Sequence, residues 1–387
     1  MIMNGSIKMN DKEIAEIRRR LKPDKANINE IIGCYVNEKH EIISEFSQSL
    51  SIISEEEAGA FLSIFRRALS GTSGQNLIDI AFSTEQVLDS AEHRLLSALR
   101  SSELKDDGII QQLIDKIVER TEMDGNYLIL LAHEVYDVPY RAKDGLGNRD
   151  ASSQTFSCIL CALCPVKLAK PALSYHAEQN EFHKRDMDWV VAAPELGFMF
   201  PAFDGRCTNI HNALYYTKDT SRSHDDFVDA VFHTEPPLPA DVQKETFQAL
   251  ITDSLDSECS YGVVQAVRDH ICERLDDHKA SGEDEPLVVS KRDISRVLSD
   301  CGVSEAAVEE FEAGYDSEYG EGAVLDANIV ADRKKFELRT PDVVIHVAPD
   351  RSDLVQTRVI NGKKYILIRA DDGVEVNGVS IDIRAGE

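Results

Sequence analysis

The sequence predicts an α+β fold, and three observations lead to this prediction. Helical periodicity marks the start of the chain and the stretch after residue 241, near-continuous apolar runs follow Gly125, and paired strand-like runs end the chain. We expect four regions: N-terminal helices with a hairpin (1–124), a central β-rich domain with a mixed sheet (125–236), an acidic helical segment (237–322) and a C-terminal β-hairpin unit (323–387).

A short helix is expected first, because apolar residues recur at helical spacing at Ile14, Ile17 and Leu21. Pro23 ends this helix, since proline cannot continue the backbone hydrogen bonding. The next segment, IIGCYVN-EKH-EIISEFS, is typical of a β-hairpin with a three-residue connection.

Three further helices are predicted before the central region. The first begins at a capping box, in which Ser54 is followed three residues later by Glu57. The second follows Ser83 as one continuous helix, and the third runs from about Asp107. Each has apolar residues at helical spacing on one face.

The central region opens with two near-continuous apolar runs, NYLILLAHEVYDVPY and FSCILCALCPVKL. Such runs are typical of strands buried on both faces, or of one strand pair under a helical cover. WVVAAP, FMFPAF and NALYYT are further strand candidates, and Pro201 places FMFPAF at an edge or a bend. EPPLPAD at 235–241 is the best candidate linker, because it is rich in proline and has no apolar periodicity.

After the linker the chain is helical to about Tyr319, and its last part is β. VVIHV is followed by LVQTRVI-NG-KKYILIRA and then by GVEV-NG-VSIDI. An Asn-Gly pair between two strand-like runs is the strongest short-range signal for a hairpin. We therefore expect a hairpin at each Asn-Gly pair.

The composition limits what the protein binds and where it resides. Lys and Arg number 42 against 69 Asp and Glu, a formal net charge of −27, so phosphate backbones and anionic membranes repel the chain unless basic residues cluster. No apolar run reaches the roughly 18 residues of a membrane helix, and the N-terminus lacks the apolar core of a signal peptide. The 8 cysteines are scattered, which favours reduced thiols. We expect a cytoplasmic protein that does not bind membranes.

Three of these cysteines, Cys158, Cys161 and Cys164, form a C-x2-C-x2-C pattern that also occurs in part of an iron–sulfur run. No fourth cysteine lies near in sequence, and residues three apart in a strand point to opposite faces. We therefore predict that the three thiols belong to the core, with a metal or cluster site as the alternative. No metal or other cofactor is expected.

Histidines and carboxylates gather in the segment 174–212, where the candidate catalytic residues are His176, Glu181, His183 and His211. Imidazole and carboxylate groups hold divalent metals or transfer protons, so a hydrolase site is the alternative interpretation of this segment. A solvated connection between two strands explains the same residues, and we prefer it.

A second polar group, His133, Glu134 and Asp137, follows an apolar run. Strand ends often display functional groups, but here we expect only a strand that emerges into water. The nucleophile elbow, the Walker loop and the dinucleotide fingerprint are all missing from the sequence.

The segment 290–315 has the spacing of a helix-turn-helix, with Leu298, Gly302 and Val308 at the expected positions. The outward face of its second helix includes Glu305 and Glu309, and these carboxylates would meet phosphates. We therefore predict an ordinary or protein-binding helical hairpin.

Two small basic clusters are the candidate contacts to nucleic acid, although a solvated face explains them as well. One lies in the opening helix and the other precedes the C-terminal β region: Arg18, Arg19 and Arg20, and Arg333, Lys334 and Lys335.

Motifs along the whole chain resemble the bacterial domain-of-unknown-function family 4317, which is typical of clostridia and related Firmicutes. They are EIAEIRRRLKPDK, GCYVNEKHEIISEFSQSL, DGNYLILLAHEVYDVPY, CPVKLAKPAL, APELGFMFPAFDGR, VDAVFHTEPPLPA, LVVSKRDI and KKYILIRADDGVEVNG. The resemblance implies a cytoplasmic bacterial protein and carries no catalytic residue with it. In the order of its elements alone, the chain is also similar to the nucleoid-associated protein family.

Together these observations favour a non-catalytic binding or assembly protein. A protein partner is expected, nucleic acid is a weaker candidate partner, and self-association stays open. A metal-dependent or acid–base hydrolase built around His176 and His183 is the alternative.

Overall fold

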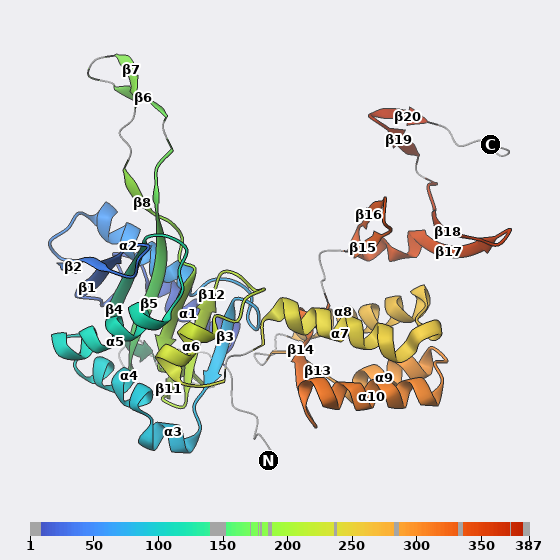
Figure 1. The fold of residues 1–387 in the computed structure, drawn as a ribbon, viewed down its shortest axis with the longest axis horizontal. Helices are drawn as coiled ribbons and strands as arrows, with labels where there is room; N and C mark the ends of the chain where they lie inside the picture. The colour runs from blue at the N-terminus through green and yellow to red at the C-terminus, as the bar shows by residue number, and fades with distance from the viewer. Residues whose placement is uncertain are drawn as a thin grey trace. The chain divides into compact units, whose positions relative to one another are not determined.

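The computed structural model describes residues 9–139, 152–170, 172–176, 178, 180–184, 188–235, 238–281, 286–331, 336–371 and 373–381 (Figure 1). The chain forms two compact units, Met1–Gln243 with Asp284–Pro286 (unit 1) and Lys244–Glu283 with Leu287–Glu387 (unit 2). The predicted regions 1–124 and 125–236 both supply strands to the sheet of unit 1, and the two later regions lie mainly in unit 2. Helices and antiparallel strands build both units, so the α+β prediction is confirmed.

Unit 1 is built on one antiparallel sheet in the order β2-β1-β4-β5-β9-β12-β3, with β8 paired to β5. The expectation of a mixed sheet is therefore wrong, because each of these strands runs antiparallel to its neighbours. Its longest strands, β4 and β5, pair from Tyr127–Pro165 to Pro139–Ser152. The predicted N-terminal hairpin is confirmed as β1 and β2. The strands are β1 (Glu30–Val36), β2 (Ile42–Ser49), β3 (Leu77–Ala81), β4 (Tyr127–Pro139), β5 (Ser152–Leu168), β8 (Trp189–Val191), β9 (Leu196–Phe200) and β12 (Asn212–Thr217).

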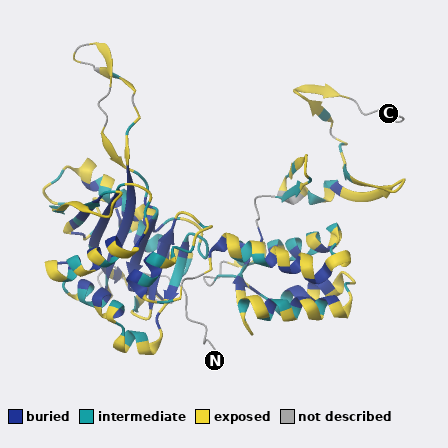
Figure 2. Cartoon of the chain, viewed as in Figure 1, coloured by how far each residue is buried: buried dark blue, intermediate teal, exposed yellow. Residues whose placement is uncertain are grey.

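Helices cover both faces of this sheet. One core joins α1 (Asp11–Arg20) and α2 (Glu55–Ala68) to one face, and a second core joins the other face to α4 (Ala91–Ser101), α5 (Asp107–Arg120) and α6 (Asp225–Phe232). The apolar runs in β4 and β5 are near-continuous because successive side chains enter opposite cores. Strands buried on both faces were predicted, and Figure 2 shows them as the darkest part of unit 1.

The cysteine pattern in β5 follows this alternation. Cys161 lies in the core under α4 and α5, whereas Cys158 and Cys164 lie in the core under α1 and α2. All three are buried, and burial raises the pKa of the Cys164 thiol to about 12. The prediction that these thiols belong to the core and do not converge is confirmed.

One local prediction needs correction, one strand was missed and one open alternative is decided. The helix after Ser83 is not continuous, because it ends as α3 (Thr84–Asp89) and Ser90 caps a new helix, α4. Strand β3 at the edge of the sheet was not predicted. FMFPAF does not lie at an edge, since β9 pairs with β5 and β12; the bend is real, and it leads through Pro201 into β10 (Ala202–Asp204), which pairs with β11 (Cys207–Asn209).

The described residues of unit 2 form a helical core and three C-terminal β-hairpins. Val289, Leu298 and Phe311 are among the buried residues of its core. Its helices and short strands are α7 (Ala240–Leu255), the 3-10 turn Asp256–Glu258, α8 (Tyr261–Ser281), β13 (Val288–Ser290), α9 (Lys291–Asp300), α10 (Glu305–Tyr319), β14 (Val324–Asp326), α11 (Ala327–Val330) and the 3-10 turn Pro349–Leu354. Within the described residues, no helix combines the length and apolarity that a membrane crossing requires.

The C-terminal hairpins confirm the prediction from the Asn-Gly pairs. Asn361 and Asn377 have φ of 51°, and the glycines that follow them have φ of 77° and 81°, as two-residue hairpin turns require. The hairpin strands are β15 (Phe336–Arg339) with β16 (Val344–Val347), β17 (Val355–Ile360) with β18 (Lys363–Ile368), and β19 (Val374–Val376) with β20 (Val379–Ile381).

Two glycines of unit 1 offer a matched test of this packing. A Cβ at Gly197 in β9 would lie 2.6 Å from the carbonyl oxygen of Cys161 and 3.2 Å from Cβ of Ala68 in α2. We expect Gly197→Ala to lower the free energy of unfolding by about 1–3 kcal/mol, as overpacking does. In α2 itself, a Cβ at Gly59 meets only Pro23, at 3.8 Å, so Gly59→Ala should raise the free energy of unfolding by about 0.5–1 kcal/mol. Urea denaturation measures both, and a loss of stability in both variants would contradict the packing described.

Candidate functional site

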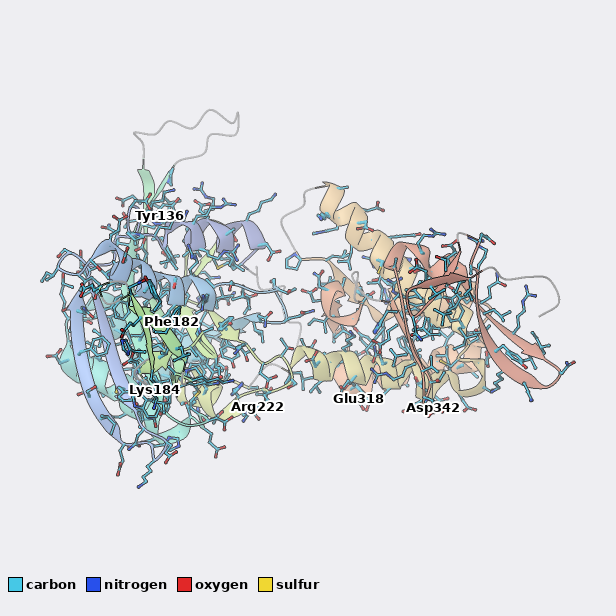
Figure 3. All side chains as sticks on the ribbon, turned by 90° about the horizontal axis from the view of Figure 1, so that it is seen from above. Tyr136, Phe182, Lys184, Arg222, Glu318 and Asp342 are labelled. Atoms are coloured by element: carbon cyan, nitrogen blue, oxygen red, sulfur yellow. The ribbon has the colours of Figure 1, made fainter. Side chains whose placement is uncertain are left out.

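A long β extension leaves the sheet of unit 1 at the end of β5. Residues Val166, Lys167 and Leu168 pair with β8 and no longer with β4 or β9, and beyond them lies a hairpin of β6 (Leu173–His176) and β7 (Glu181–Lys184). We call residues 167–191 the β arm. It projects at the top of Figure 1, and in Figure 3, seen from above, it points toward the viewer with Phe182 and Lys184 labelled.

The hairpin of the β arm is amphipathic. Tyr175 pairs with Phe182 and Leu173 pairs with Lys184, so these four side chains share one face. The rings of Tyr175 and Phe182 lie 5.3 Å apart, between centroids. The exposed fractions are 74% for Leu173, 51% for Tyr175 and 66% for Phe182, so the apolar face is open to solvent.

The base of the arm continues this exposed apolar surface. Trp189, the single tryptophan of the chain, is 57% exposed and pairs with Leu168, and Val190 and Val191 are exposed beside it. The residues 167–191 carry 4 Lys or Arg and 4 Asp or Glu, so the arm has no net charge in a chain of −27. Large exposed apolar surfaces mark interaction sites, and a neutral one suits a protein surface better than a polyanion.

The predicted catalytic residues of this segment are only partly brought together. His183 Nε2 lies 3.3 Å from a carboxylate oxygen of Glu181, and both side chains are exposed on the polar face of the hairpin. His176 pairs with Glu181 through the backbone ladder, and its side chain is not described. His211 is exposed two residues after β11, and β11 lies at the opposite end of unit 1 from β7 (Figure 1). Among the described residues, no three His, Cys, Asp or Glu side chains are grouped to hold a metal ion.

One arginine of the predicted basic cluster in α1 binds a buried carboxylate. Arg20 Nε donates to Oε1 of Glu134 at 2.9 Å, and the backbone N–H of Asn27 donates to the other carboxylate oxygen at 2.8 Å. The guanidinium also lies over the ring of Tyr136, 4.2 Å from its centroid. Arg19 is exposed and Arg18 is half-buried. Arg333, Lys334 and Lys335 lie outside the described residues.

The expectation that the strand emerges into water is wrong at Glu134, which is buried. Its side chain is 0% exposed in the interior of β4, and burial raises the pKa of its carboxyl above the ordinary value, although Arg20 and the N–H of Asn27 offset part of the rise. Beside it, Tyr136 (labelled in Figure 3) donates to Glu16 at 2.7 Å, and Arg206 donates to the same carboxylate at 2.8 Å. These polar contacts hold α1 against the sheet.

The helical hairpin of α9 and α10 has the predicted form. Gly302 has φ of 81° in the turn, Leu298 and Phe311 are fully buried, and Val308 is half-buried. The glutamates at 305, 309 and 310 are exposed on α10. This outward acidic face is the one that sequence analysis predicted.

One basic surface of the structure was not predicted from the sequence. The hairpin β17–β18 exposes Arg358, Lys363 and Lys364, and the stretch 354–370 contains no Asp or Glu. Arg358 pairs with Tyr365, and Lys363 follows on the same face of the two-stranded ribbon. The signal in the sequence is the Asn-Gly turn flanked by cations without any nearby carboxylate.

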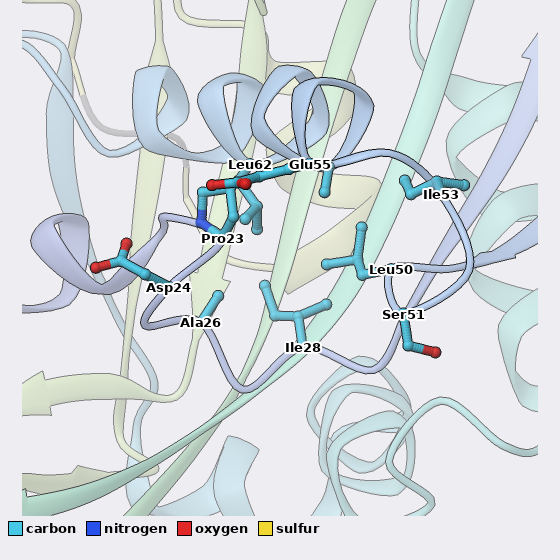
Figure 4. Close-up of a pocket in the computed structure, with 10 residues that line it drawn as sticks. Pro23, Asp24, Ala26, Ile28, Leu50, Ser51, Ile53, Glu55 and Leu62 are labelled. Carbon is cyan, nitrogen blue, oxygen red and sulfur yellow. The ribbon is translucent and has the colours of Figure 1, made fainter.

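A pocket of about 400 Å³ opens at the start of α2 (Figure 4). Its apolar wall comes from three separate segments, at Pro23, Ala26, Ile28, Leu50, Ile53 and Leu62. Asp24 and Glu55 add exposed carboxylates. No pattern in the sequence pointed to this pocket, because its residues meet only in the folded unit.

A family model described as domain of unknown function (DUF4317) matches residues 9–379, nearly the whole chain. This agrees with the resemblance found in the sequence motifs. Neither the curated proteins nor the solved structures contain a match.

The Arg20–Glu134 pair makes a prediction with an internal control. Arg20→Ala should lower the free energy of unfolding by about 3 kcal/mol near neutral pH, because it leaves a buried carboxylate without its cation. Arg19→Ala, one position away and exposed, should change it by less than about 0.5 kcal/mol.

The loss in Arg20→Ala should shrink as the pH falls. Without Arg20 the folded-state pKa of Glu134 rises further above its unfolded value. The loss of stability is therefore complete above the folded-state pKa, shrinks as the pH falls below it, and vanishes once the carboxyl is protonated in both states. Urea denaturation at about pH 7.5 and about pH 5 measures this difference. Equal losses at both pH values would contradict a buried ionised Glu134.

Proposed function

The chain belongs to the DUF4317 family, and we propose that it is a non-catalytic binding and assembly protein of the bacterial cytoplasm that holds a protein partner through its β arm. The observation that supports this most is the open apolar face of Leu173, Tyr175 and Phe182 on a hairpin that extends beyond the sheet.

Burial of the exposed apolar side chains of the arm by a partner is favourable in free energy. Burying one large apolar side chain stabilises a complex by about 1.5–3 kcal/mol, and the arm offers three aromatic side chains that are each at least half exposed. A two-stranded hairpin is only marginally stable alone in water. A partner that covers Tyr175, Phe182 and Trp189 would therefore both stabilise the arm and gain affinity from it.

The hydrolase alternative has less support. Enzyme sites are concave and hold their polar groups in a shared environment. Glu181 and His183 instead lie exposed on a hairpin, His211 follows β11 at the other end of unit 1 (Figure 1), and the pocket beside α2 contains none of them.

We expect the apolar face of the arm to dominate partner binding. Partners captured by the tagged full chain from the host should be identified, purified and titrated against variants. Phe182→Ser should weaken binding by about thirtyfold or more, as truncation of an aromatic anchor does. Leu88→Ser removes a side chain that is also exposed, 68%, but lies on α3, and should leave the affinity unchanged. Equal affinities for wild type and Phe182→Ser would rule the arm out.

A second candidate, contact with nucleic acid of the kind nucleoid proteins make, is favoured by the basic ribbon β17–β18. Arg358, Lys363 and Tyr365 combine cations with a stacking surface, which single-stranded nucleic acids require. The charge of −27 opposes such contact elsewhere on the chain, so an acid-free ribbon is the best place for it.

Filter binding of single-stranded DNA across a salt series tests this candidate. Each phosphate neutralised contributes about 0.7 to the log–log salt slope, so replacing Arg358 and Lys363, which share a face of the ribbon, by Ala should flatten the slope by about 1.4. Arg18→Ala with Arg19→Ala tests the N-terminal cluster in the same assay. If the wild type does not bind even at low salt, the nucleic-acid candidate is wrong and the protein partner remains.

A further inference from the structure

We infer that the partner of the β arm is a second copy of this chain, whose pocket beside α2 receives the arm. This inference rests on the proposed function and adds to it the identity of the partner and the surface that binds.

The two surfaces match in chemistry. The arm presents Tyr175 and Phe182 with Lys184 on the same face, and the pocket presents an apolar wall with two exposed carboxylates, Asp24 and Glu55. An aromatic side chain would enter the pocket while the ammonium group of Lys184 meets a carboxylate. This pairing uses both classes of group, apolar and charged, that each surface exposes.

The pocket also matches the arm in size. At about 400 Å³ it lies near the lower end of the range of about 300–1,000 Å³ for binding pockets, which suits one aromatic anchor and its neighbour. Ile52 extends the apolar surface next to it, since it is 84% exposed between Ser51 and Ile53, which both line the pocket.

Charge is compatible with this contact between two copies. Two chains of −27 repel one another, so self-association needs a contact in which cations of one copy meet carboxylates of the other. Lys167, Lys170 and Lys184 are exposed on the arm, and Glu56 and Glu57 are exposed beside Glu55 at the start of α2.

Exchange of arms between two copies forms a closed, symmetric dimer. Each copy carries one arm and one pocket, and none of the residues that line the pocket comes from the arm. Two copies related by a two-fold axis can exchange arms, which makes two identical contacts and leaves neither arm uncovered. A dimer is therefore the expected assembly.

Sedimentation of the full chain between about 1 and 100 μM tests the inference. The wild type and Leu88→Ser should form dimers, and Phe182→Ser should weaken dimerisation by about thirtyfold or more. Asp24→Lys with Glu55→Lys should weaken it by at least about tenfold, since both carboxylates would become like charges opposite Lys184. Adding Lys184→Glu to that pocket variant should restore much of the affinity, because the charges are then exchanged.

Fluorescence locates the anchor directly. Replacing Trp189 by Phe and Phe182 by Trp leaves one tryptophan, at the tip of the arm. Its emission should shift to shorter wavelength as the dimer forms, and Asp24→Lys with Glu55→Lys should prevent the shift at the same concentration.

The outcomes separate the two proposals. A wild type that stays monomeric while Phe182→Ser still abolishes binding of another protein overturns the second copy and keeps the proposed function. A dimer that Phe182→Ser disrupts but the pocket variant does not overturns the pocket. If Phe182→Ser changes neither dimerisation nor partner binding, both proposals fail.

Discussion

Burial of β4 and β5 on both faces is the constraint on which unit 1 depends. Their side chains alternate between two cores, so the sheet requires a layer of helices on each side. Helices α1 and α2 close one side, and α4, α5 and α6 close the other. The same alternation separates Cys161 from Cys158 and Cys164, which explains why a pattern that resembles a metal motif is part of the core.

That burial also makes the ionised form of Glu134, the buried acidic residue of β4, energetically costly. Glu134 enters the core under α1, where an ionised carboxylate is tolerated only with a cation and hydrogen bonds. Arg20 and the N–H of Asn27 supply them, and the contacts of Glu16 with Tyr136 and Arg206 extend the polar layer. One of the three arginines that suggested a nucleic-acid contact is thus needed within the fold.

The β arm continues the alternation of apolar and polar residues beyond the part of the sheet that helices cover. Beyond Leu168 the hairpin still alternates apolar and polar residues, but no element among the described residues covers the apolar face at Tyr175 and Phe182. An uncovered face of this kind in a chain of −27 links the fold to the proposed function, since association must combine apolar burial with local charge pairing. The pocket at Asp24 and Glu55 offers both.

The sequence by itself determined the features that depend on neighbours along the chain. The capping box of Ser54 and Glu57, the hairpin turns at Asn361 and Asn377, and the alternation of the three cysteines all follow from local geometry. Only the tertiary structure decided which side chains are covered. Arg20 and Glu134 are 114 residues apart, the pocket joins three separate segments, and the exposure of Phe182 depends on helices that do not extend over it. Burial and charge pairing arise between elements distant in sequence, and local patterns therefore leave them open.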